Sequence, residues 1–418
     1  MNLEGVCMAE KFPDGTLIED FFLDNKEPDE SKYGKKYIVT DYGIKDDGNV
    51  YTEAFQKLID DIYEAGGGAV TIPKGVYKTG ALFFKQGVNL YLEEGGTLLG
   101  SDDIADYPVC DTRIEGESCK YFSALINAEG IDGFLLGGKG TIDGNGHKSW
   151  RAFWIRRKWN PNCTNKDEQR PRLIYLSNCK NAVLSGVTMQ NSHFWTNHIY
   201  KCNHIKFLRL KILSPGQPVN APSTDAIDID VCSDVLVKKC YMAVNDDAVA
   251  LKGGKGRNAD KLLENGGNER IVIEDCDYGF CHSCLTFGSE SIYDRNVIMR
   301  RIKVSEGKNI VWLKFRPDTP QHYEYCEISD IEGNINNFLN VGRWKQFADG
   351  SSIENPMISR ANNFYMHDCR INCNMFYNVP ELSGDFIIKD IVLRDISATE
   401  RFKSKSPEFV QEKGLTFE

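Results

Sequence analysis

Three aspartates in the middle of the chain have the residue type and spacing that acid–base chemistry requires. Asp225 lies in STDAIDID, and Asp246 and Asp247 follow 21 and 22 residues later in NDDAVALKGG. Carboxylates that are held close together repel one another, so at least one keeps its proton to higher pH. A protonated acid beside an ionised carboxylate is the pair that hydrolyses a glycosidic bond. The acid protonates the leaving oxygen, and the carboxylate activates water.

A repeated segment explains how these aspartates could meet. The phrases KNAVLSGVTMQNS, NHIKFLRLKILSP, SDVLVKKCYMAVN, ERIVIEDCDYGFC and RNVIMRRIKVSEG each begin with polar residues and then alternate apolar and polar ones. Aligned on Ala182, Ile205, Val235, Ile271 and Val297, they recur at spacings of 23, 30, 36 and 26 residues. Such self-similarity without helical periodicity predicts a parallel β-helix. One coil is about as long as the aspartate spacing, so the pair stacks above or below Asp225.

We therefore predict an all-β, single-domain, right-handed parallel β-helix with an N-terminal capping helix. Residues 1–75 hold a strand and the helix, residues 76–398 the coils, and residues 399–418 a tail that packs across the far end or frays. Thr52 is the expected N-cap, and Gly66 to Gly68 end the helix. Its apolar stripe covers the open end of the coils and consists of Phe55, Leu58, Ile59, Ile62 and Tyr63.

Long loops are expected where coils lengthen, at 101–123, 149–172, 253–269, 316–325 and 342–362. In a solenoid, such loops gather on one side and form the walls of the binding face. Loop 149–172 carries basic residues at 156–158 between Trp154 and Trp159, and loop 342–362 carries Arg343, Trp344 and Lys345. Walls of this kind can close one end of a cleft, which favours exo action on a chain end.

The chain resembles glycoside hydrolase family 28, the polygalacturonase and rhamnogalacturonase family, from about residue 37 to about residue 340. The family's NTD, DD, GHG and RIK markers occur in order. They are Ser223-Thr224-Asp225, Asp246-Asp247, Cys281-His282-Ser283 and Trp312-Leu313-Lys314. GTIDGNG (140–146), RPRLI (170–174) and NSHFWTNH (191–198) also resemble family phrases.

The resemblance implies a role for each matched residue. Asp246 would be the general acid, while Asp225 and Asp247 would activate the water and invert the anomeric carbon. His282 would hydrogen-bond within the carboxylate group and help to hold the acid's proton. Lys314 would contact the sugar beside the scissile bond.

Two departures from the family pattern affect the predicted substrate. Ser223 replaces the Asn of NTD, and Trp312 replaces the Arg of RIK. An arginine grips a carboxylate with a bidentate fork, and tryptophan cannot. Trp312 can instead stack on an apolar sugar face, which favours a rhamnogalacturonan-type backbone. Arg316 is the candidate to restore the missing charge. Further candidate substrate contacts, one coil before Asp225, are Trp195 and His198.

The composition of the chain limits the classes of molecule that it is expected to bind. The formal net charge of −10 disfavours nucleic acid and anionic membranes, and no apolar stretch could span a membrane. The first residues, MNLEGVCMAEKF, lack the features of a secretion signal. We expect a periplasmic or secreted protein whose signal is missing, although a cytoplasmic one fits equally. The 14 cysteines are interpreted as small core residues, with no disulfide framework. We expect no metal or other cofactor and a monomer that binds an acidic pectic glycan.

Four functions are consistent with these residues. The first is an inverting, exo-acting galacturonidase on rhamnogalacturonan-type oligosaccharides, and the second is an exo-polygalacturonase on homogalacturonan. The third is a pectate-lyase-type enzyme that cleaves by β-elimination and needs calcium. The fourth is a carbohydrate-binding β-helix without catalysis.

Overall fold

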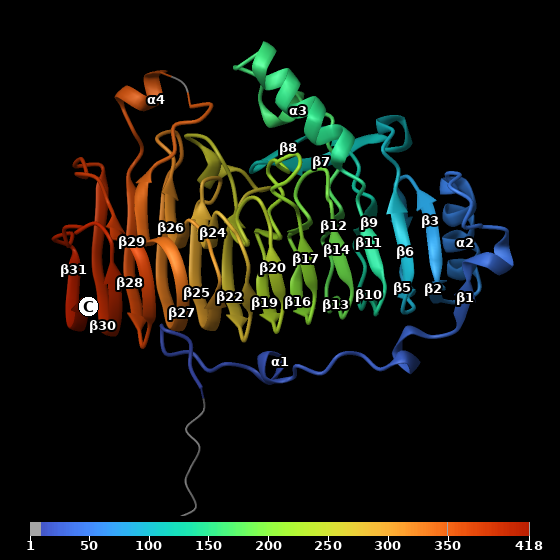
Figure 1. Cartoon of the computed structure of the whole chain (residues 1–418), viewed down its shortest axis with the longest axis horizontal. Helices are drawn as coiled ribbons and strands as arrows, with labels where there is room; N and C mark the ends of the chain where they lie inside the picture. The colour runs from blue at the N-terminus through green and yellow to red at the C-terminus, as the bar shows by residue number, and fades with distance from the viewer. Residues whose placement is uncertain (1–9, 349, 418) are drawn as a thin grey trace, which may run out of the picture.

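The computed structural model describes residues 10–348 and 350–417 and is a right-handed parallel β-helix (Figure 1). Almost all strands join one 29-stranded sheet in which each strand pairs in parallel with the strand one coil later. The first nine residues, on which the expectation about a secretion signal mainly depends, lie outside the described part. No helix among the described residues is long and apolar enough to cross a membrane.

Each early coil contributes one strand to each of three rows. The first row contains β1 (Lys36–Ile38), β2 (Gly68–Ile72), β5 (Val88–Leu92), β10 (Leu135–Gly138), β13 (Val183–Ser185), β16 (Asn203–Leu208), β19 (Ser233–Lys238), β22 (Gly267–Glu274) and β25 (Tyr293–Val304). The second contains β3 (Gly75–Thr79), β6 (Gly96–Gly100), β11 (Thr141–Asp143), β14 (Thr188–Gln190), β17 (Lys211–Leu213), β20 (Tyr241–Ala243) and β23 (Asp277–Tyr278). The third contains β4 (Leu82–Phe84), β9 (Ile126–Glu129), β12 (Ile174–Ser177), β15 (Asn197–Tyr200), β18 (Ile227–Asp230), β21 (Val249–Lys252), β24 (Ser283–Gly288) and β26 (Asn309–Phe315).

The last coils have longer strands, all but β28 of which extend over more than one row. They are β27 (Gln321–Arg343), β28 (Ser359–His367), β29 (Arg370–Asn378), β30 (Phe386–Glu400) and β31 (Val410–Phe417). The tail expected to pack across the end or fray instead contains β31, which pairs in parallel with β30. The stack therefore continues to residue 417.

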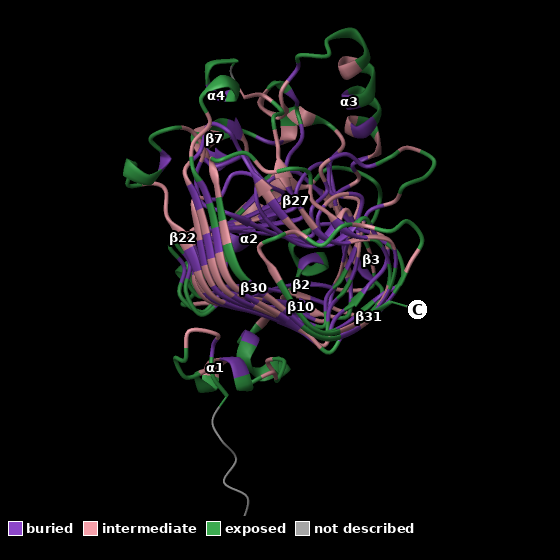
Figure 2. Ribbon diagram, turned by 90° about the vertical axis from the view of Figure 1, so that its left-hand side faces the viewer, coloured by how far each residue is buried: buried purple, intermediate pink, exposed green. Residues whose placement is uncertain are grey.

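The register of the first row confirms the sequence alignment of the repeats. Ile205 pairs with Val235, Val235 with Ile271, and Ile271 with Val297. All four side chains are fully buried and belong to one apolar core inside the coils, and Figure 2 shows that buried positions recur on neighbouring strands. All the buried cysteines except Cys163 belong to this core, and none of the 13 cysteines in the described residues forms a disulfide.

The predicted capping helix is α2 (Thr52–Glu64), which lies against the first coil (Figure 1). Four members of the predicted stripe are buried, while Tyr63 is 45% exposed. The expectation for Thr52 was wrong. It is the first helical residue, after the N-cap Tyr51, and its hydroxyl accepts a hydrogen bond from the Gly80 N–H at 2.7 Å.

The predicted loops contain more regular structure than expected. Segment 101–123 forms an antiparallel hairpin of β7 (Val109–Ile114) and β8 (Glu117–Phe122). Segment 149–172 contains most of helix α3 (His147–Trp159), and segment 342–362 contains the short helix α4 (Gly350–Glu354). Figure 2 places α3, α4 and β7 on the same side of the coil axis, so the prediction that these insertions gather on one side is confirmed.

Residues 10–35, here called the strap, run along the outside of the coils on the side opposite α3 and α4 (Figures 1 and 2). The strap includes helix α1 (Asp20–Leu23). Phe12 and Phe22 are buried against apolar side chains of successive coils, among them Leu208 and Leu236. The strap therefore ties several coils together.

Candidate active site

The coil register brings the three aspartates together. The Ala226 N–H donates to the Asp247 carbonyl oxygen at 3.0 Å, so Asp225 and Asp247 hold equivalent positions in successive coils. One carboxylate oxygen from each of Asp225, Asp246 and Asp247 lies within 4.8 Å of the others. The predicted stacking is thus present, and we call these three residues the aspartate triad.

The members of the triad differ in exposure and in partners. The side chain of Asp246 is 25% exposed, whereas Asp225 and Asp247 are only 3% and 1% exposed. Within the described residues, neither carboxylate oxygen of Asp247 accepts a hydrogen bond. Asp246 is therefore the member of the triad that a substrate can reach most easily.

Protonation differs across the triad. Burial, followed by the charges of Asp228 and Asp246, holds the pKa of Asp225 well above its usual range. Burial also disfavours ionisation of Asp246, but the hydrogen bond and charge of His282 outweigh it and lower the Asp246 pKa to about 2. The prediction that one acid keeps its proton is supported: within the triad that acid is Asp225, and burial also raises the pKa of the neighbouring Asp228 to about 8.

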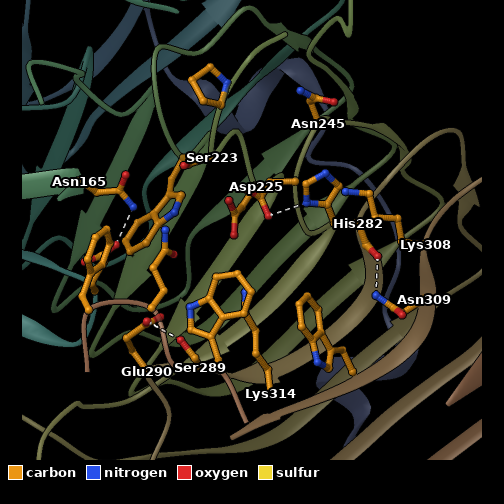
Figure 3. A pocket seen from close by; sticks show the side chains of 18 of the residues that line it. Asn165, Ser223, Asp225, Asn245, His282, Ser289, Glu290, Lys308, Asn309 and Lys314 are labelled. Atoms are coloured by element: carbon orange, nitrogen blue, oxygen red, sulfur yellow. Dashed lines mark hydrogen bonds and ion pairs between the residues drawn. The ribbon is translucent and has the colours of Figure 1, made fainter. Parts of the chain in front are cut away.

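His282 and Lys314 flank the triad from the following coils (Figure 3). His282 Nδ1 lies 3.3 Å from Oδ1 of Asp246. Lys314 Nζ lies 3.7 Å from Oδ2 of Asp247. The Lys314 ammonium also lies 4.6 Å and 4.4 Å from the ring centroids of Trp312 and Trp344. The positive charge of Lys314 is therefore stabilised by one carboxylate and by two aromatic rings.

The triad lies in a cavity of about 580 Å³ with two walls. Phe153, Trp154 and Arg157 of α3 line one wall. Residues 344–347, which follow β27, line the other wall with Trp344, Gln346 and Phe347. The Arg157 guanidinium lies 4.5 Å from the Phe153 ring centroid and 5.8 Å from that of Phe347, so it spans both walls.

Five predicted substrate contacts line this cavity, namely Ser223, Trp195, Trp312, Lys314 and Arg316. Ser223 has a left-handed backbone with φ of 53°, a conformation that favours Asn among non-glycine residues. That preference fits the Asn which the family pattern has at this position. Trp195 lies beneath the cavity, 96% buried, with the Lys252 ammonium 5.1 Å from its ring centroid.

Arg316 does not replace the positive charge of the arginine that the family pattern has at the position of Trp312. It lines the cavity but is only 1% exposed, and its Nε and Nη2 atoms donate to Asp318 at 2.7 and 2.6 Å. Its Nη1 also lies 3.6 Å from Glu290. The guanidinium is committed to these carboxylates.

The structure does not bring His198 or Arg343 to the cavity. His198 is fully buried, and its ring contacts Arg172 at 2.6 Å and Asp230 at 3.3 Å. It is covered by the β7–β8 hairpin, from which Arg113 donates to Asp230 at 2.7 Å. Arg343 instead donates to the carbonyl oxygen of Arg316 and forms an ion pair with Asp385. Both predictions were wrong because local ion pairs engage these side chains.

Lys252 is a cavity residue that the sequence analysis missed. It is 4% exposed and lies 3.6 Å from Asp228 and 3.5 Å from Glu290. Burial opposes its charge, but Glu290 and Asp228 raise the Lys252 pKa well above its usual range. The alternation in NDDAVALKGG contained a signal, since inward Val249 and Leu251 imply outward Ala250 and Lys252.

The aspartate triad also has the spacing of a metal site. Among the described residues, the triad is the one group of three acidic, histidine or cysteine side chains with metal-ligand spacing. Lys314 beside Asp247 supplies a positive charge at the same place. Cys281 and Cys284 are fully buried with Sγ atoms 3.9 Å apart.

Comparison with solved structures agrees with the fold. The exopolygalacturonase of Thermotoga maritima superposes with a TM-score of 0.73 over 95% of this chain and 94% of that one, at 20% sequence identity. Fold and site together define a parallel β-helix protein with a buried carboxylate centre. The sequence profile of glycosyl hydrolases family 28 matches residues 69–317. The chain belongs to this family, as its motifs indicated.

Two curated relatives illustrate the range of similarity. The probable polygalacturonase of Vitis vinifera is 29% identical over 221 residues, covering 51% of this chain and 43% of that protein. The exo-poly-alpha-D-galacturonosidase of Dickeya chrysanthemi is 28% identical over 271 residues, covering 53% and 43%. The matches thus span less than half the length of each of these relatives.

Proposed function

We propose that the chain is an inverting, exo-acting glycosidase that removes terminal α-linked galacturonic acid from pectic glycans of the rhamnogalacturonan type. The observation that carries this proposal is the aspartate triad in a cavity with two walls. The family and the relatives named exo-acting galacturonosidases support it. Three carboxylates can supply both the acid and the base that hydrolysis requires.

Asp246 is the proposed general acid because it is the most exposed member of the triad. It gives a proton to the glycosidic oxygen as the bond from that oxygen to the anomeric carbon breaks. A water held by Asp225 and Asp247 attacks the anomeric carbon from the opposite face and passes its proton to them. The products are a free galacturonic acid and a shortened glycan.

The proton must reach Asp246 before this step. In the free site Asp225 holds it, and the triad oxygens lie within 4.8 Å of one another. A sugar bound over Asp246 removes water from its carboxylate, and desolvation disfavours the charged form. We infer that substrate binding moves the proton within the triad, from Asp225 to Asp246.

The two walls support exo action. Arg157 of α3 lies against Phe347 of the opposite wall, which restricts the passage of a continuous polymer across the cavity. A chain end fits a cavity of this kind better than a chain interior. The supporting residues come from insertions outside the coils, so they can vary without changing the triad.

The surroundings of Trp312 support a substrate in which the sugar of the leaving group carries no carboxylate. Trp312 and Trp344 meet edge to face with ring centroids 5.7 Å apart, and both line the cavity. Aromatic faces suit the apolar face of a neutral sugar such as rhamnose. Arg316 is neutralised by its own partners and cannot replace the arginine that the family pattern has at Trp312.

A second candidate is an exo-polygalacturonase on homogalacturonan. It is favoured by Lys308, an exposed cavity residue that forms no ion pair with any described residue, and by the names of the relatives. An ammonium at that place could hold a second galacturonate carboxylate. Both candidates release galacturonic acid, and they differ only in the leaving-group sugar to which it is linked.

One experiment tests the proposal against all alternatives. The purified chain is incubated with polygalacturonan and with rhamnogalacturonan oligosaccharides that end in galacturonic acid, and the products are identified by mass and reducing end. We expect monomeric galacturonic acid, released faster from the rhamnogalacturonan series. Faster release from polygalacturonan would support the second candidate. Unsaturated products lost on chelation would indicate a lyase, and no product from either substrate would overturn the proposal.

A further inference from the structure

The outer face of helix α3 carries a stripe of basic and apolar side chains. Lys148, Arg151, Ile155, Lys158 and Trp159 are all exposed. Their spacings of 3, 7, 10 and 11 residues from Lys148 place them on one side of an α-helix. Ile155 is 60% exposed and Trp159 is 84% exposed. We call these five residues the α3 stripe.

The charge of α3 differs from that of the rest of the chain. Its 13 residues include five Lys or Arg and no acidic residue, whereas the chain as a whole has a net charge of −10. Arg156 and Arg157 lie near Glu168, on the side away from the stripe. Lys148, Arg151 and Lys158 form no ion pair with any described residue. A helix face that carries three cations outside any ion pair is suited to bind an anion from solution.

A groove lies beside the stripe. Its volume is about 410 Å³, and Lys148, Arg151 and Ile155 contribute to its lining together with His147. The one acidic residue that lines the groove, Asp102, forms an ion pair with Lys78 at 2.9 Å. The groove therefore presents positive charge beside an apolar side chain, the combination that an acidic sugar chain requires.

The stripe and the active-site cavity lie on two sides of the same helix. Trp154 and Arg157 face the cavity, and the Trp154 indole N–H donates to the Asn220 carbonyl oxygen at 2.7 Å, which fixes α3 to the coils. Figure 1 shows α3 projecting above the coils, so its outer side is open to solvent. A polymer bound to the stripe is held close to the cavity without entering it.

We propose that the α3 stripe is a second binding site for acidic pectic polysaccharide, separate from the catalytic cavity. This inference rests on the proposed function for the identity of the polymer. Carboxylates of the chain pair with Lys148, Arg151 and Lys158, while Trp159 and Ile155 contact sugar faces. The site raises the local concentration of chain ends near the cavity and leaves hydrolysis of short substrates unchanged.

The test uses the triple variant Lys148→Glu/Arg151→Glu/Lys158→Glu. The matched control Lys211→Glu/Lys303→Glu/Lys389→Glu reverses three exposed lysines on the coils and changes the net charge equally. Binding to polygalacturonate is measured by affinity electrophoresis in an Asp246→Asn background, so that the polymer is not consumed. We expect binding about tenfold weaker for the α3 triple and unchanged for the control, with the difference reduced by salt.

Two further measurements separate the possible outcomes. With Asp246 intact, hydrolysis of a galacturonate dimer and the thermal midpoint should be unaffected in both triples, while KM for the polymer rises only in the α3 triple. Trp159→Ala should weaken polymer binding without changing charge. Equal binding by the α3 triple and its control would overturn the second site. Equal binding of double-stranded DNA would overturn its selectivity for pectic chains. Failure of every protein to cleave the dimer would refute the proposed function but leave the binding result readable.

Discussion

The Nδ1 atom of His282 lies 3.3 Å from Oδ1 of Asp246, so the imidazole acts on the most exposed acid of the triad. This contact lowers the pKa of Asp246 to about 2 against the effect of burial. His282 thereby keeps Asp246 ionised in the free site and leaves the triad's proton on Asp225. The contact between His282 and Asp246 therefore helps to set the pH range in which the triad holds one proton.

Replacing His282 should move the acidic limit of activity. Without the imidazole, burial dominates and the pKa of Asp246 rises, so the triad takes up a second proton at higher pH. We expect the acidic limb of the kcat/KM profile of His282→Ala to shift upward by about one pH unit or more, with kcat reduced about 10- to 100-fold. His322→Gln, a change on a later coil, is the control. An unshifted acidic limb would show that His282 does not set the protonation of Asp246.

The variant Trp312→Arg tests which sugar the enzyme accepts as the leaving group. The new guanidinium would stand beside Lys314 and could form the carboxylate fork that the family pattern has there. We expect the ratio of kcat/KM on digalacturonate to that on a rhamnogalacturonan oligosaccharide to rise about tenfold. Trp312→Phe, which keeps an aromatic face and adds no charge, should leave the ratio near its original value. If both variants change the ratio equally, the lost indole rather than the restored charge is responsible.

The anomer of the first product tests the stereochemistry. Inverting enzymes commonly separate their two carboxyl groups by about 6.5–9.5 Å, whereas retaining ones separate them by about 5–5.5 Å. The triad oxygens lie within 4.8 Å, so the distance alone would favour retention. The family pattern implies inversion, with the water held by the acids themselves. Proton NMR during the first turnovers should show the β-anomer of galacturonic acid, and initial α-anomer would establish retention.

The strap should contribute to stability. Phe22 is 3% exposed and packs edge to face on Phe12 with ring centroids 5.4 Å apart. Phe22→Ala removes buried contacts with several coils and should lower the free energy of unfolding by about 3 kcal/mol. Leu17→Ala, at a strap residue that is 59% exposed, should change it by less than about 0.5 kcal/mol. Equal effects in urea denaturation would mean that the strap adds no packing energy.

The coils and the triad could be predicted because they follow from a local rule. Apolar alternation sets the register of Val235 on Ile271, and the register then stacks Asp247 on Asp225. His198 could not be predicted because it is buried by Arg113 and the hairpin, which is inserted far away in the sequence. Helix α3 was missed because Trp150 is buried while Trp154 and Trp159 are exposed, so its aromatic residues form no single stripe.

The rate of Asp246→Asn on a substrate that ends in galacturonic acid tests the central claim most directly. An amide cannot give the leaving oxygen a proton, and its shape preserves the cavity. The account predicts that kcat falls about 10³-fold or more while KM stays within about threefold. Asp294→Asn, a similar change at a buried acid outside the cavity, should keep wild-type kcat. Turnover by Asp246→Asn at the wild-type rate would contradict the assignment of the triad as the hydrolytic centre.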